Sequence, residues 1–441
     1  MAVSLRSPFD RDIARLAVPA VGALAAEPVY VLTDTAIVGR LGTPQLGGLA
    51  VAATLVLTGY SVFIFLAYGT TGTVARLLGA GQVDRAAAQG VQALWLAAGV
   101  GVSLAALGLV LAEPAVALMG ADPEVTPFAL TYLRISMAGV PSLMLVLAGT
   151  GYLRGLQDTR TPLVVAVGSA VANLLVELVL VFGLDLGIAG SAWSTVLAQT
   201  GAAAVYVSIV ARHVRGAAVS VRPDRAALRA LAAVSRDLFV RTAALRASLL
   251  VATAVAARTG VVELGAHQVA FELWSFLALV LDAIAIAGQA LVGRLLGAGD
   301  ADGARSASRR MVEWGVAAGL AFGLAVLALA GALPRLFSDD EQVVGVAASL
   351  LVWVAVLQPV NAMVFVLDGV LIGAGDLRYL AWAMTLAALA FVPVAVGVRL
   401  LDLGIHWLWA AISLLMVVRL VSLGRRWRGG AWAVVGAELA R

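Results

Sequence analysis

Several acidic residues lie inside apolar stretches of this sequence that are long enough to be membrane helices. The stretch PVYVLTDTAIVGRLG begins at Pro28 and carries Asp34, and the stretch NLLVE begins at Asn173 and ends at Glu177. Hydrocarbon is a poor solvent for a carboxylate, so an ionisable residue within a membrane segment is by default a candidate functional residue. A carboxyl group in such a place can exchange protons or hold a cation. These residue types therefore predict a proton- or cation-binding site.

The composition identifies the surroundings of these acids. The chain has 441 residues, of which 62% are hydrophobic and 13% charged, and its mean hydropathy is +0.99. Soluble domains carry about 25% charged residues. The sequence therefore predicts an integral membrane protein whose solvent is lipid.

Missing residue types exclude several classes of function. The chain has no cysteine, and all 30 of its basic residues are arginine. Disulfides and thiolate metal sites are therefore excluded, and so are a phosphate-binding Walker A loop and a Schiff-base enzyme, because both need a lysine. Its 3 histidines are far apart and lack the spacing of zinc ligands. We expect neither an enzyme nor a nucleic-acid-binding protein, and no cofactor.

Twelve apolar segments approach the roughly 20 residues that a helix needs to cross the hydrocarbon. The first follows Arg15 and is too long for a cleavable signal peptide, so we expect it to be retained. The candidate spans are 14–38, 47–72, 89–112, 126–150, 162–183, 188–211, 239–257, 265–290, 311–333, 343–370, 379–400 and 405–423.

Arginine placement predicts the orientation of these spans. If the N-terminus is cytoplasmic, most arginines between the spans fall on the cytoplasmic side, as the positive-inside rule requires. We therefore expect a multi-pass protein of a cell membrane, a bacterial inner membrane in particular, with both termini in the cytoplasm.

The sequence also repeats itself at a single offset. RLLGAG occurs at Arg76 and again 218 positions later at Arg294, and Pro141 and Gly155 recur at the same offset as Pro359 and Gly373. Six helices in each half give both halves the same orientation, which is typical of transporters that work by alternating access. The expected organisation is an N-terminal lobe (1–211), a cytoplasmic linker (212–238) and a C-terminal lobe (239–441).

The N-terminal lobe contains the predicted coupling site. Asp34 and Glu177 lie in the outer halves of the first and fifth spans, and Asn173 is one helical turn from Glu177 on the same face. We expect these three residues to share one pocket. Further candidates for the cavity lining or a gate are Glu27, Tyr30 and Gln199, with Thr195 adding polar surface.

Pro28 precedes Asp34 by six residues and bears on its mobility. Proline removes a backbone hydrogen bond and permits a kink, so the segment that carries Asp34 can swing. The alternative is a tolerated membrane proline without a mechanical role.

The C-terminal lobe holds further candidates, of which two are opposed in charge. Arg246 and Asp282 lie at similar depths on the seventh and eighth spans. They form either a structural ion pair, or a cytoplasmic gate or second coupling site, and the sequence leaves these open. Glu272 on the eighth span is a candidate for the cavity.

Four segments together resemble one known family. They are LTDTAIVGRLG, NLLVELVLVFGLDLGIAGSAWSTVLAQ, GAHQVAFELWSFLALVLDAIAIAGQALVGRLLGAG and LDGVLIGAGD. They are similar to the multidrug and toxic compound extrusion (MATE) family, specifically its DinF-like branch, and the resemblance runs over nearly the whole chain.

The resemblance implies a fold and a mechanism. It implies an all-α membrane protein with twelve helices in two pseudo-symmetric lobes, which exports organic cations or amphipathic toxins in exchange for protons or sodium. Asp34 and Pro28 match the family's proton-binding aspartate and kinking proline, while Glu177 stands where an aspartate is usual. The acid that the sodium-coupled branch places on the seventh helix is missing between Phe239 and Ala257, which favours protons.

The prediction is therefore a monomeric proton-coupled exporter of small amphipathic or cationic compounds, in contact with membrane lipid. Two related functions are alternatives. A sodium-coupled exporter would use Asn173 as an oxygen ligand. A lipid-linked saccharide flippase would need several cavity arginines, and only Arg134 and Arg246 lie deep in spans.

Overall fold

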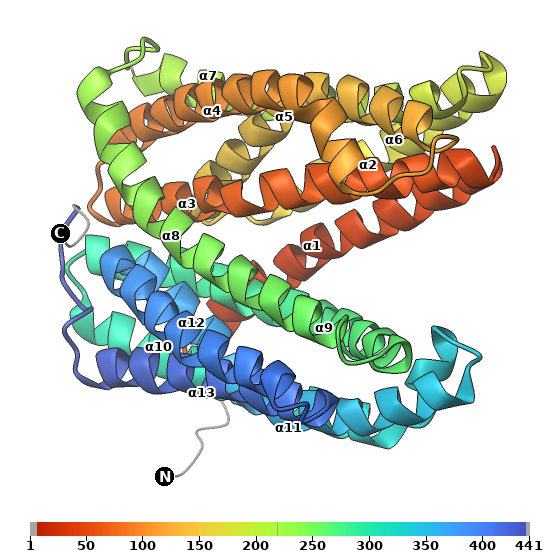
Figure 1. Cartoon of the computed structure of the whole chain (residues 1–441). Coiled ribbons are helices and arrows are strands. Elements are labelled where there is room, and N and C mark those ends of the chain that lie inside the picture. Colours follow the sequence, from red (N-terminus) through yellow and green to blue (C-terminus); the bar gives the residue numbers. More distant parts are fainter. Residues whose placement is uncertain (1–6, 218, 438–441) are drawn as a thin grey trace. The chain divides into compact units, whose positions relative to one another are not determined.

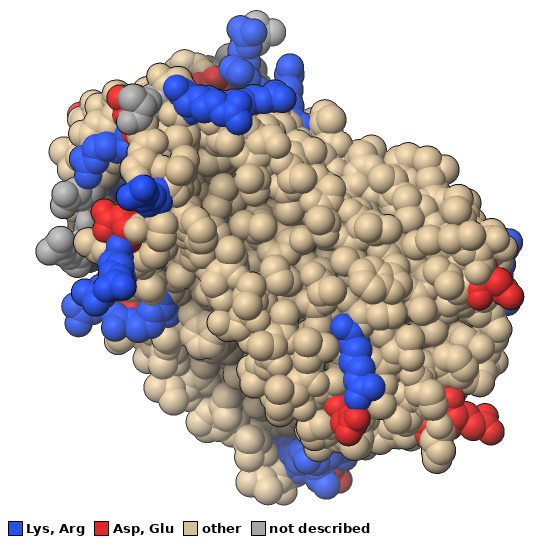
Figure 2. All heavy atoms as spheres, turned by 90° about the horizontal axis from the view of Figure 1, so that it is seen from above, with Lys and Arg blue, Asp and Glu red and all other residues tan. Residues whose placement is uncertain are grey.

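A computed structural model describes residues 7–217 and 219–437, and this part of the chain is helical and contains no strand (Figure 1). Twelve helical segments are long and apolar enough to cross a membrane, which confirms the predicted number. Hydrocarbon offers backbone groups no hydrogen-bond partner, so a spanning chain must satisfy them within helices. On the face drawn in Figure 2, most charged side chains gather near the edges and leave a wide uncharged area.

The first six spans contain nine helical elements. They are α1 (Asp10–Gly39), α2 (Thr43–Ser61), η1 (Val62–Ile64), α3 (Phe65–Gly79), α4 (Val83–Leu118), α5 (Thr126–Gly155), α6 (Arg160–Leu178), η2 (Val179–Gly183) and α7 (Gly187–Ala217). α2, η1 and α3 form one span, and so do α6 and η2.

The last six spans contain one long helix each. They are α8 (Arg225–Ala256), α9 (Val261–Gly297), α10 (Ala301–Leu329), α11 (Glu341–Gly373), α12 (Leu377–Leu400) and α13 (Ile405–Arg428), with the short η3 (Leu333–Leu336) before α11. Within the predicted linker 212–238, the residues from Arg225 onward form the start of α8, which continues without interruption into the seventh span.

The contacts divide the described chain into two compact units. One is Pro19–Ser235, and the other combines the described residues before Pro19 with those from Arg236 onward. The N-terminal boundary therefore falls inside α1, after Val18. The lobe boundaries expected from the sequence stay predictions, and below we call these two groups the first unit and the second unit.

The start of α1 belongs to the second unit because of a network on Asp10. The Asp10 carboxylate accepts hydrogen bonds from Arg310 Nε at 2.6 Å and Nη2 at 3.0 Å, and from Trp314 Nε1 at 2.9 Å. Two parallel bonds from one guanidinium to one carboxylate are strong and directional. They hold the first turn of α1 against α10.

The 218-residue offset recurs in the helix packing of both units. A Cβ atom at Gly151 of α5 would lie 2.4 Å from the Ala67 carbonyl oxygen, and one at Gly369 of α11 would lie 2.3 Å from that of Ala285. Gly369 and Ala285 lie 218 positions after Gly151 and Ala67, respectively. Such approaches exclude a side chain, which is why small residues mark helix contacts in membranes.

The repeat extends to an unusual backbone conformation. Asp185, before α7, has a φ of 53°, and Asp402, before α13, has a φ of 51°. Residues other than glycine rarely adopt this left-handed conformation, although aspartate tolerates it better than most. DLGI occurs at Asp185 and again at Asp402, 217 positions later. The two segments form the same turn before the last helix of each repeat.

The second unit has a buried charge cluster that joins α8, α11 and α13. Asp368 on α11 accepts hydrogen bonds from Arg241 Nη2 on α8 and Arg419 Nη2 on α13, each at 2.5 Å. All three side chains are less than 10% exposed. The cluster ties three helices together through one carboxylate.

We expect Asp368→Ala to destabilise the protein strongly, because it leaves two buried guanidinium groups without their carboxylate. Removing one partner of a buried ion pair costs about 3–5 kcal/mol. Asp302→Ala is the matched control, since its pair with Arg305 involves a carboxylate that is 95% exposed and such pairs contribute about 0–1 kcal/mol. Thermal unfolding in detergent measures both. Equal shifts in melting temperature would contradict a structural role for the cluster.

Candidate functional site

The Asp34 carboxylate lies buried in the first unit, where two hydroxyl groups hold it. The side chain is on α1, and the residue is 5% exposed. Ser191 Oγ on α7 donates a hydrogen bond to Asp34 Oδ1 at 2.5 Å, and Tyr132 Oη on α5 donates to Oδ2 at 3.2 Å. Both carboxyl oxygens thus have a donor, so burial of the charged form is compensated.

A second carboxyl group reaches the same place from α6. Glu177 is completely buried, Asn173 is 2% exposed, and the Glu177 carboxyl group lies close enough to Asp34 and Ser191 for their charge and dipole to act on it. Asn173 Nδ2 lies 3.5 Å from Glu177 Oε2, which is a long hydrogen bond. The structure therefore brings together the three residues expected to share a pocket.

Two oxygen atoms at this site have open coordination. Within the described residues, neither Asn173 Oδ1 nor Glu177 Oε1 has a hydrogen-bond partner. Two adjacent carboxylates repel each other when both are charged, so the pair favours a bound proton or cation. The described residues contain no group of three histidine, cysteine or acidic side chains arranged around a metal position.

Polar groups of α1 and α7 extend the site. The Tyr30 hydroxyl bonds to Thr195 Oγ1, and Thr195 Oγ1 also lies 3.2 Å from the Ser191 carbonyl oxygen. A network thus leads from Tyr30 along α7 to the residue that holds Asp34. Ring hydroxyls and threonine oxygens of this kind both donate and accept, which lets them adapt to a change of charge.

Three other candidates lie in the same unit but outside this network. Glu27 is exposed and accepts a hydrogen bond from the Tyr60 hydroxyl of α2. Gln199 is half-buried beside α5, where a Cβ atom at Gly139 would lie 2.7 Å from its Oε1 atom. Pro28 lies within α1, which continues through it as one helix.

The remaining candidates belong to the second unit. Arg246 on α8 is exposed, Glu272 on α9 is exposed and accepts a hydrogen bond from Gln268 at 2.8 Å, and Asp282 is half-buried. Among the described residues, the ion pairs of this region join Asp368 to arginines other than Arg246. The ion pair or gate expected of Arg246 and Asp282 stays a prediction.

Sequence reasoning missed Ser191 and Tyr132, the two donors to Asp34. Ser191 is one helical turn before Thr195, which was a candidate, so the i, i+4 spacing was an available signal. Tyr132 lies among apolar residues of α5, and Ser136 is its polar neighbour one turn along on the same face. Only the crossing of α1 and α5 identifies it.

Comparisons with known proteins agree on one family. The family model described as MatE matches residues 19–179 and again 239–396. Protein DETOXIFICATION 44, chloroplastic, of Arabidopsis thaliana is 30% identical over 96% of this chain and 81% of its own length. DNA damage-inducible protein F of Escherichia coli (strain K12) is 29% identical over 96% of this chain and 94% of its own.

A solved structure agrees with the fold. The outward-facing conformation of a multidrug resistance MATE family transporter of the MOP superfamily superposes with a TM-score of 0.86, at 19% identity and over 96% of both chains. At this identity the likeness supports the fold alone. The two separate matches of the family model also fall on the two halves of the repeat.

Ser191→Ala should change the infrared carboxyl band of Asp34, because the substitution removes the donor to Oδ1. Ser194→Ala is the matched control, since Ser194 is also buried on α7 but its hydroxyl bonds only to the Ser191 carbonyl. Difference spectra across a pH jump, with the Asp34 band assigned by its loss in Asp34→Asn, measure both. An Asp34 band unchanged in Ser191→Ala would show that this hydrogen bond is absent in the membrane.

Proposed function

Because this chain belongs to the MatE family, we propose that it exports organic cations or amphipathic toxins across a membrane in exchange for protons. The chain is a multi-pass membrane transporter and not an enzyme. Relatives carry names such as Multidrug and toxin extrusion protein 2 of Mus musculus. Their extrusion of small organic compounds supports the same class of substrate here.

The observation that carries proton coupling is the pair of buried carboxyl groups. Asp34 and Glu177 lie near each other at a place where two hydroxyl groups bind Asp34, and Glu177 Oε1 has no hydrogen-bond partner in the described chain. A proton neutralises one member of the pair and relieves the repulsion between them. A substrate cation bound beside the pair also relieves this repulsion, because its positive charge offsets the two negative charges.

Mutually exclusive occupancy then couples the two movements. When the pair is deprotonated, its negative charge attracts a cationic substrate. When a proton binds, that attraction ends and the substrate leaves. One site that holds either a proton or a cation, but not both, exchanges them in opposite directions when access alternates between the two sides of the membrane.

We assign a permissive role to Pro28 in this cycle. It has no backbone N–H, so the Leu24 carbonyl lacks its usual partner and α1 bends more easily there. Asp34 lies beyond this point on the same helix. A bend at Pro28 would therefore move Asp34 relative to its donors on α5 and α7.

The proposal includes the arrangement in the cell. Both termini face the cytoplasm of a bacterial inner membrane, following the arginine distribution. A single chain carries the whole carboxyl pair and its donors, so the unit of function is a monomer. The coupling ion is H⁺, and no further cofactor takes part.

Asp34→Asn should reduce substrate efflux by at least about tenfold, because the amide cannot exchange a proton and a lost charged hydrogen bond alone is worth roughly 1.5–3 kcal/mol. The measurement is efflux of a fluorescent organic cation from proteoliposomes without sodium, driven by an imposed pH gradient. Asp122→Asn is the control, since Asp122 is exposed before α5.

Two outcomes would contradict the proposal. Full activity of Asp34→Asn would make this acid structural and move the coupling to Glu177. Activity of the wild type that appears only when a sodium gradient replaces the pH gradient would make the protein a sodium-coupled exporter, in which Asn173 Oδ1 is an ion ligand.

Glu177→Gln should also reduce efflux by about tenfold or more, whereas Glu177→Asp should retain most of it. The glutamine removes the ionisable group from the pair, while the aspartate keeps it with a side chain one methylene shorter. The same proteoliposome assay, together with thermal unfolding to show that each variant folds, makes the comparison. If the glutamine variant were fully active, Glu177 would have no part in coupling.

A further inference from the structure

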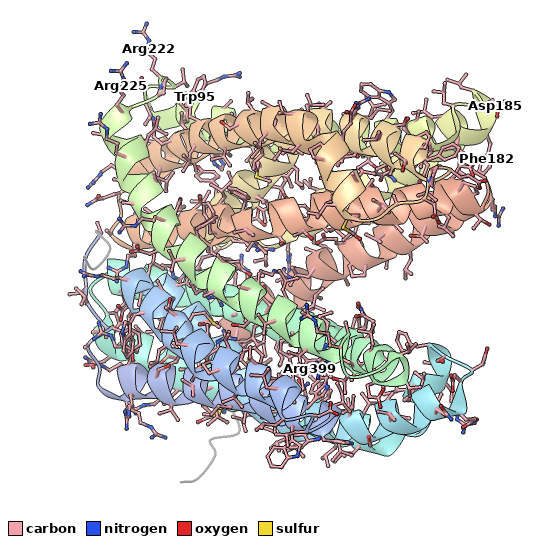
Figure 3. The ribbon with its side chains drawn as sticks, in the orientation of Figure 1. Trp95, Phe182, Asp185, Arg222, Arg225 and Arg399 are labelled. Atoms are coloured by element: carbon pink, nitrogen blue, oxygen red, sulfur yellow. The ribbon has the colours of Figure 1, made fainter. Side chains whose placement is uncertain are left out.

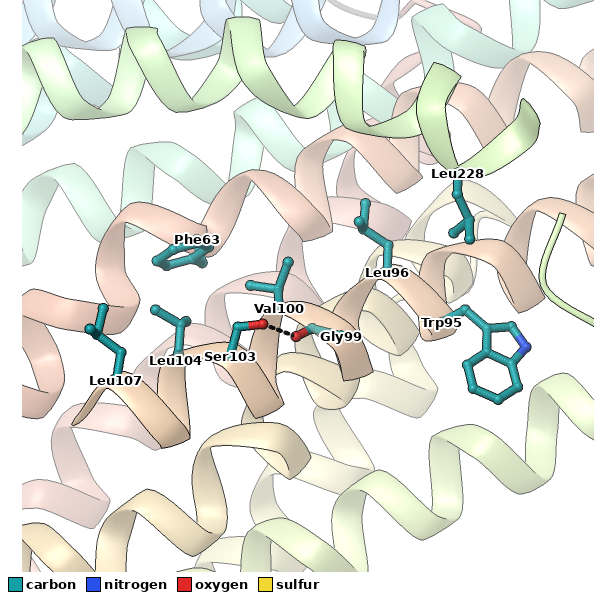
Figure 4. Close-up of a pocket in the computed structure, with 9 residues that line it drawn as sticks. All are labelled: Phe63, Trp95, Leu96, Gly99, Val100, Ser103, Leu104, Leu107 and Leu228. Carbon is teal, nitrogen blue, oxygen red and sulfur yellow. Dashed lines mark hydrogen bonds between the residues drawn. The ribbon is translucent and has the colours of Figure 1, made fainter. Parts of the chain in front are cut away.

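An apolar groove opens on the surface of the first unit, away from the carboxyl pair. Its lining comes mainly from α4, with one residue each from η1 and α8, and it has a volume of about 550 Å³ (Figure 4). The lining residues are Phe63, Trp95, Leu96, Gly99, Val100, Ser103, Leu104, Leu107 and Leu228. The Ser103 hydroxyl bonds to the Gly99 carbonyl of its own helix at 2.8 Å, so it offers no free donor to an occupant.

The length of the groove suits one leaflet of a membrane. Its lining on α4 runs from Trp95 to Leu107, which are 48% and 54% exposed. Twelve residues of helix rise about 18 Å, and the hydrocarbon of one leaflet is about 15 Å thick. An extended acyl chain therefore fits along α4 from the membrane surface toward its centre.

One end of the groove carries unbalanced positive charge. Arg225 and Arg229 flank the lining residue Leu228 on α8, and Arg222 lies in the connection just before that helix. All three are exposed, and none forms an ion pair within the described residues. The neighbouring Asp224 caps α8, where its Oδ1 accepts a hydrogen bond from Ala226 N at 2.7 Å.

Hydrogen bonds fix this basic end against the groove. Trp95 Nε1 donates to the Val221 carbonyl at 2.9 Å, and Gln92 Nε2 donates to the Arg222 carbonyl at 3.0 Å. Figure 3 shows Trp95, Arg222 and Arg225 at the same corner of the molecule. Tryptophan is enriched where a membrane protein passes from hydrocarbon to headgroups, so the arginines lie at headgroup level.

We propose that this groove binds an anionic phospholipid, with one acyl chain along α4 and the headgroup phosphate on Arg222, Arg225 and Arg229. Charge and shape agree on this occupant, because phosphate pairs well with guanidinium groups and an apolar slot of leaflet length suits a chain without polar groups. The groove lies beside the connection between α7 and α8, which hydrogen bonds from Trp95 and Gln92 hold against α4. Bound lipid would brace that connection, independently of which ion drives transport.

The test compares phosphatidylglycerol with phosphatidylcholine of the same acyl chains, added to the purified protein in detergent. We expect phosphatidylglycerol to raise the melting temperature of the wild type and phosphatidylcholine to have little effect. The triple variant Arg222→Gln, Arg225→Gln, Arg229→Gln should bind phosphatidylglycerol about fivefold more weakly for each charge removed, as measured by native mass spectrometry.

A second variant tests the acyl-chain part of the groove. Gly99→Phe should also abolish the effect of phosphatidylglycerol, since a side chain there projects into the slot. No atom lies within 4 Å of the position of its Cβ, so the helix accepts the change without a clash. Gly168→Phe is the matched control, because Gly168 on α6 is exposed and equally open but lies outside the groove.

Charge has its own control, and three outcomes would overturn the proposal. The variant Arg11→Gln, Arg309→Gln, Arg378→Gln loses the same charge at exposed positions elsewhere, and we expect it to bind phosphatidylglycerol like the wild type. If this control lost as much phosphatidylglycerol binding as the groove variant, the attraction would be nonspecific and electrostatic. Retained binding in Gly99→Phe would mean that no chain enters the groove. Equal stabilisation by glycerol phosphate would mean that the arginines bind a phosphate group without its lipid.

Discussion

A carboxylate in the hydrocarbon core must obtain its hydrogen bonds from protein, because water does not supply them there. Asp34 meets this requirement with hydroxyl groups from two helices, Ser191 on α7 and Tyr132 on α5. The three helices must therefore converge at one point. At Gly139 the helices α5 and α7 also come close, since a Cβ atom there would lie 2.7 Å from Gln199 Oε1 and 3.2 Å from Val196 Cγ2. The packing of the first unit and the chemistry of its site thus have the same origin.

Much of this organisation follows from patterns that a sequence displays directly. The twelve spans are visible because length and apolarity alone decide whether a helix can cross hydrocarbon. The repeat is visible partly because Gly155 and Gly373 occupy matching close contacts. A Cβ atom there would lie 2.9 Å from the Thr71 carbonyl oxygen and 2.6 Å from that of Gln289, respectively. Asp34, Asn173 and Glu177 were found for a similar reason: polar residues are conspicuous in apolar helices.

Partners of those residues were harder to find. Serine and tyrosine have many roles in membrane helices. Ser191 and Tyr132 donate to Asp34 only because α7 and α5 come close to α1 at this point. The burial of Arg241 and Arg419 could not be predicted for a different reason. Each lies in a helix that also carries arginines nearer to the surface. The depth of a residue along a helix was predictable from the sequence, but the direction in which its side chain points was not.

The bond between Asp10 and Arg310 makes α1 a helix that begins in one unit and continues in the other. If the backbone were cut in the α7–α8 connection, the N-terminal fragment would still carry the start of α1. The contacts of these residues complete the second unit, whose other helices belong to the C-terminal fragment. Two such fragments would exchange an element in the manner of a domain-swapped dimer. Fragment complementation is then a property of the architecture itself, and co-expressed halves should recognise each other through the first turns of α1.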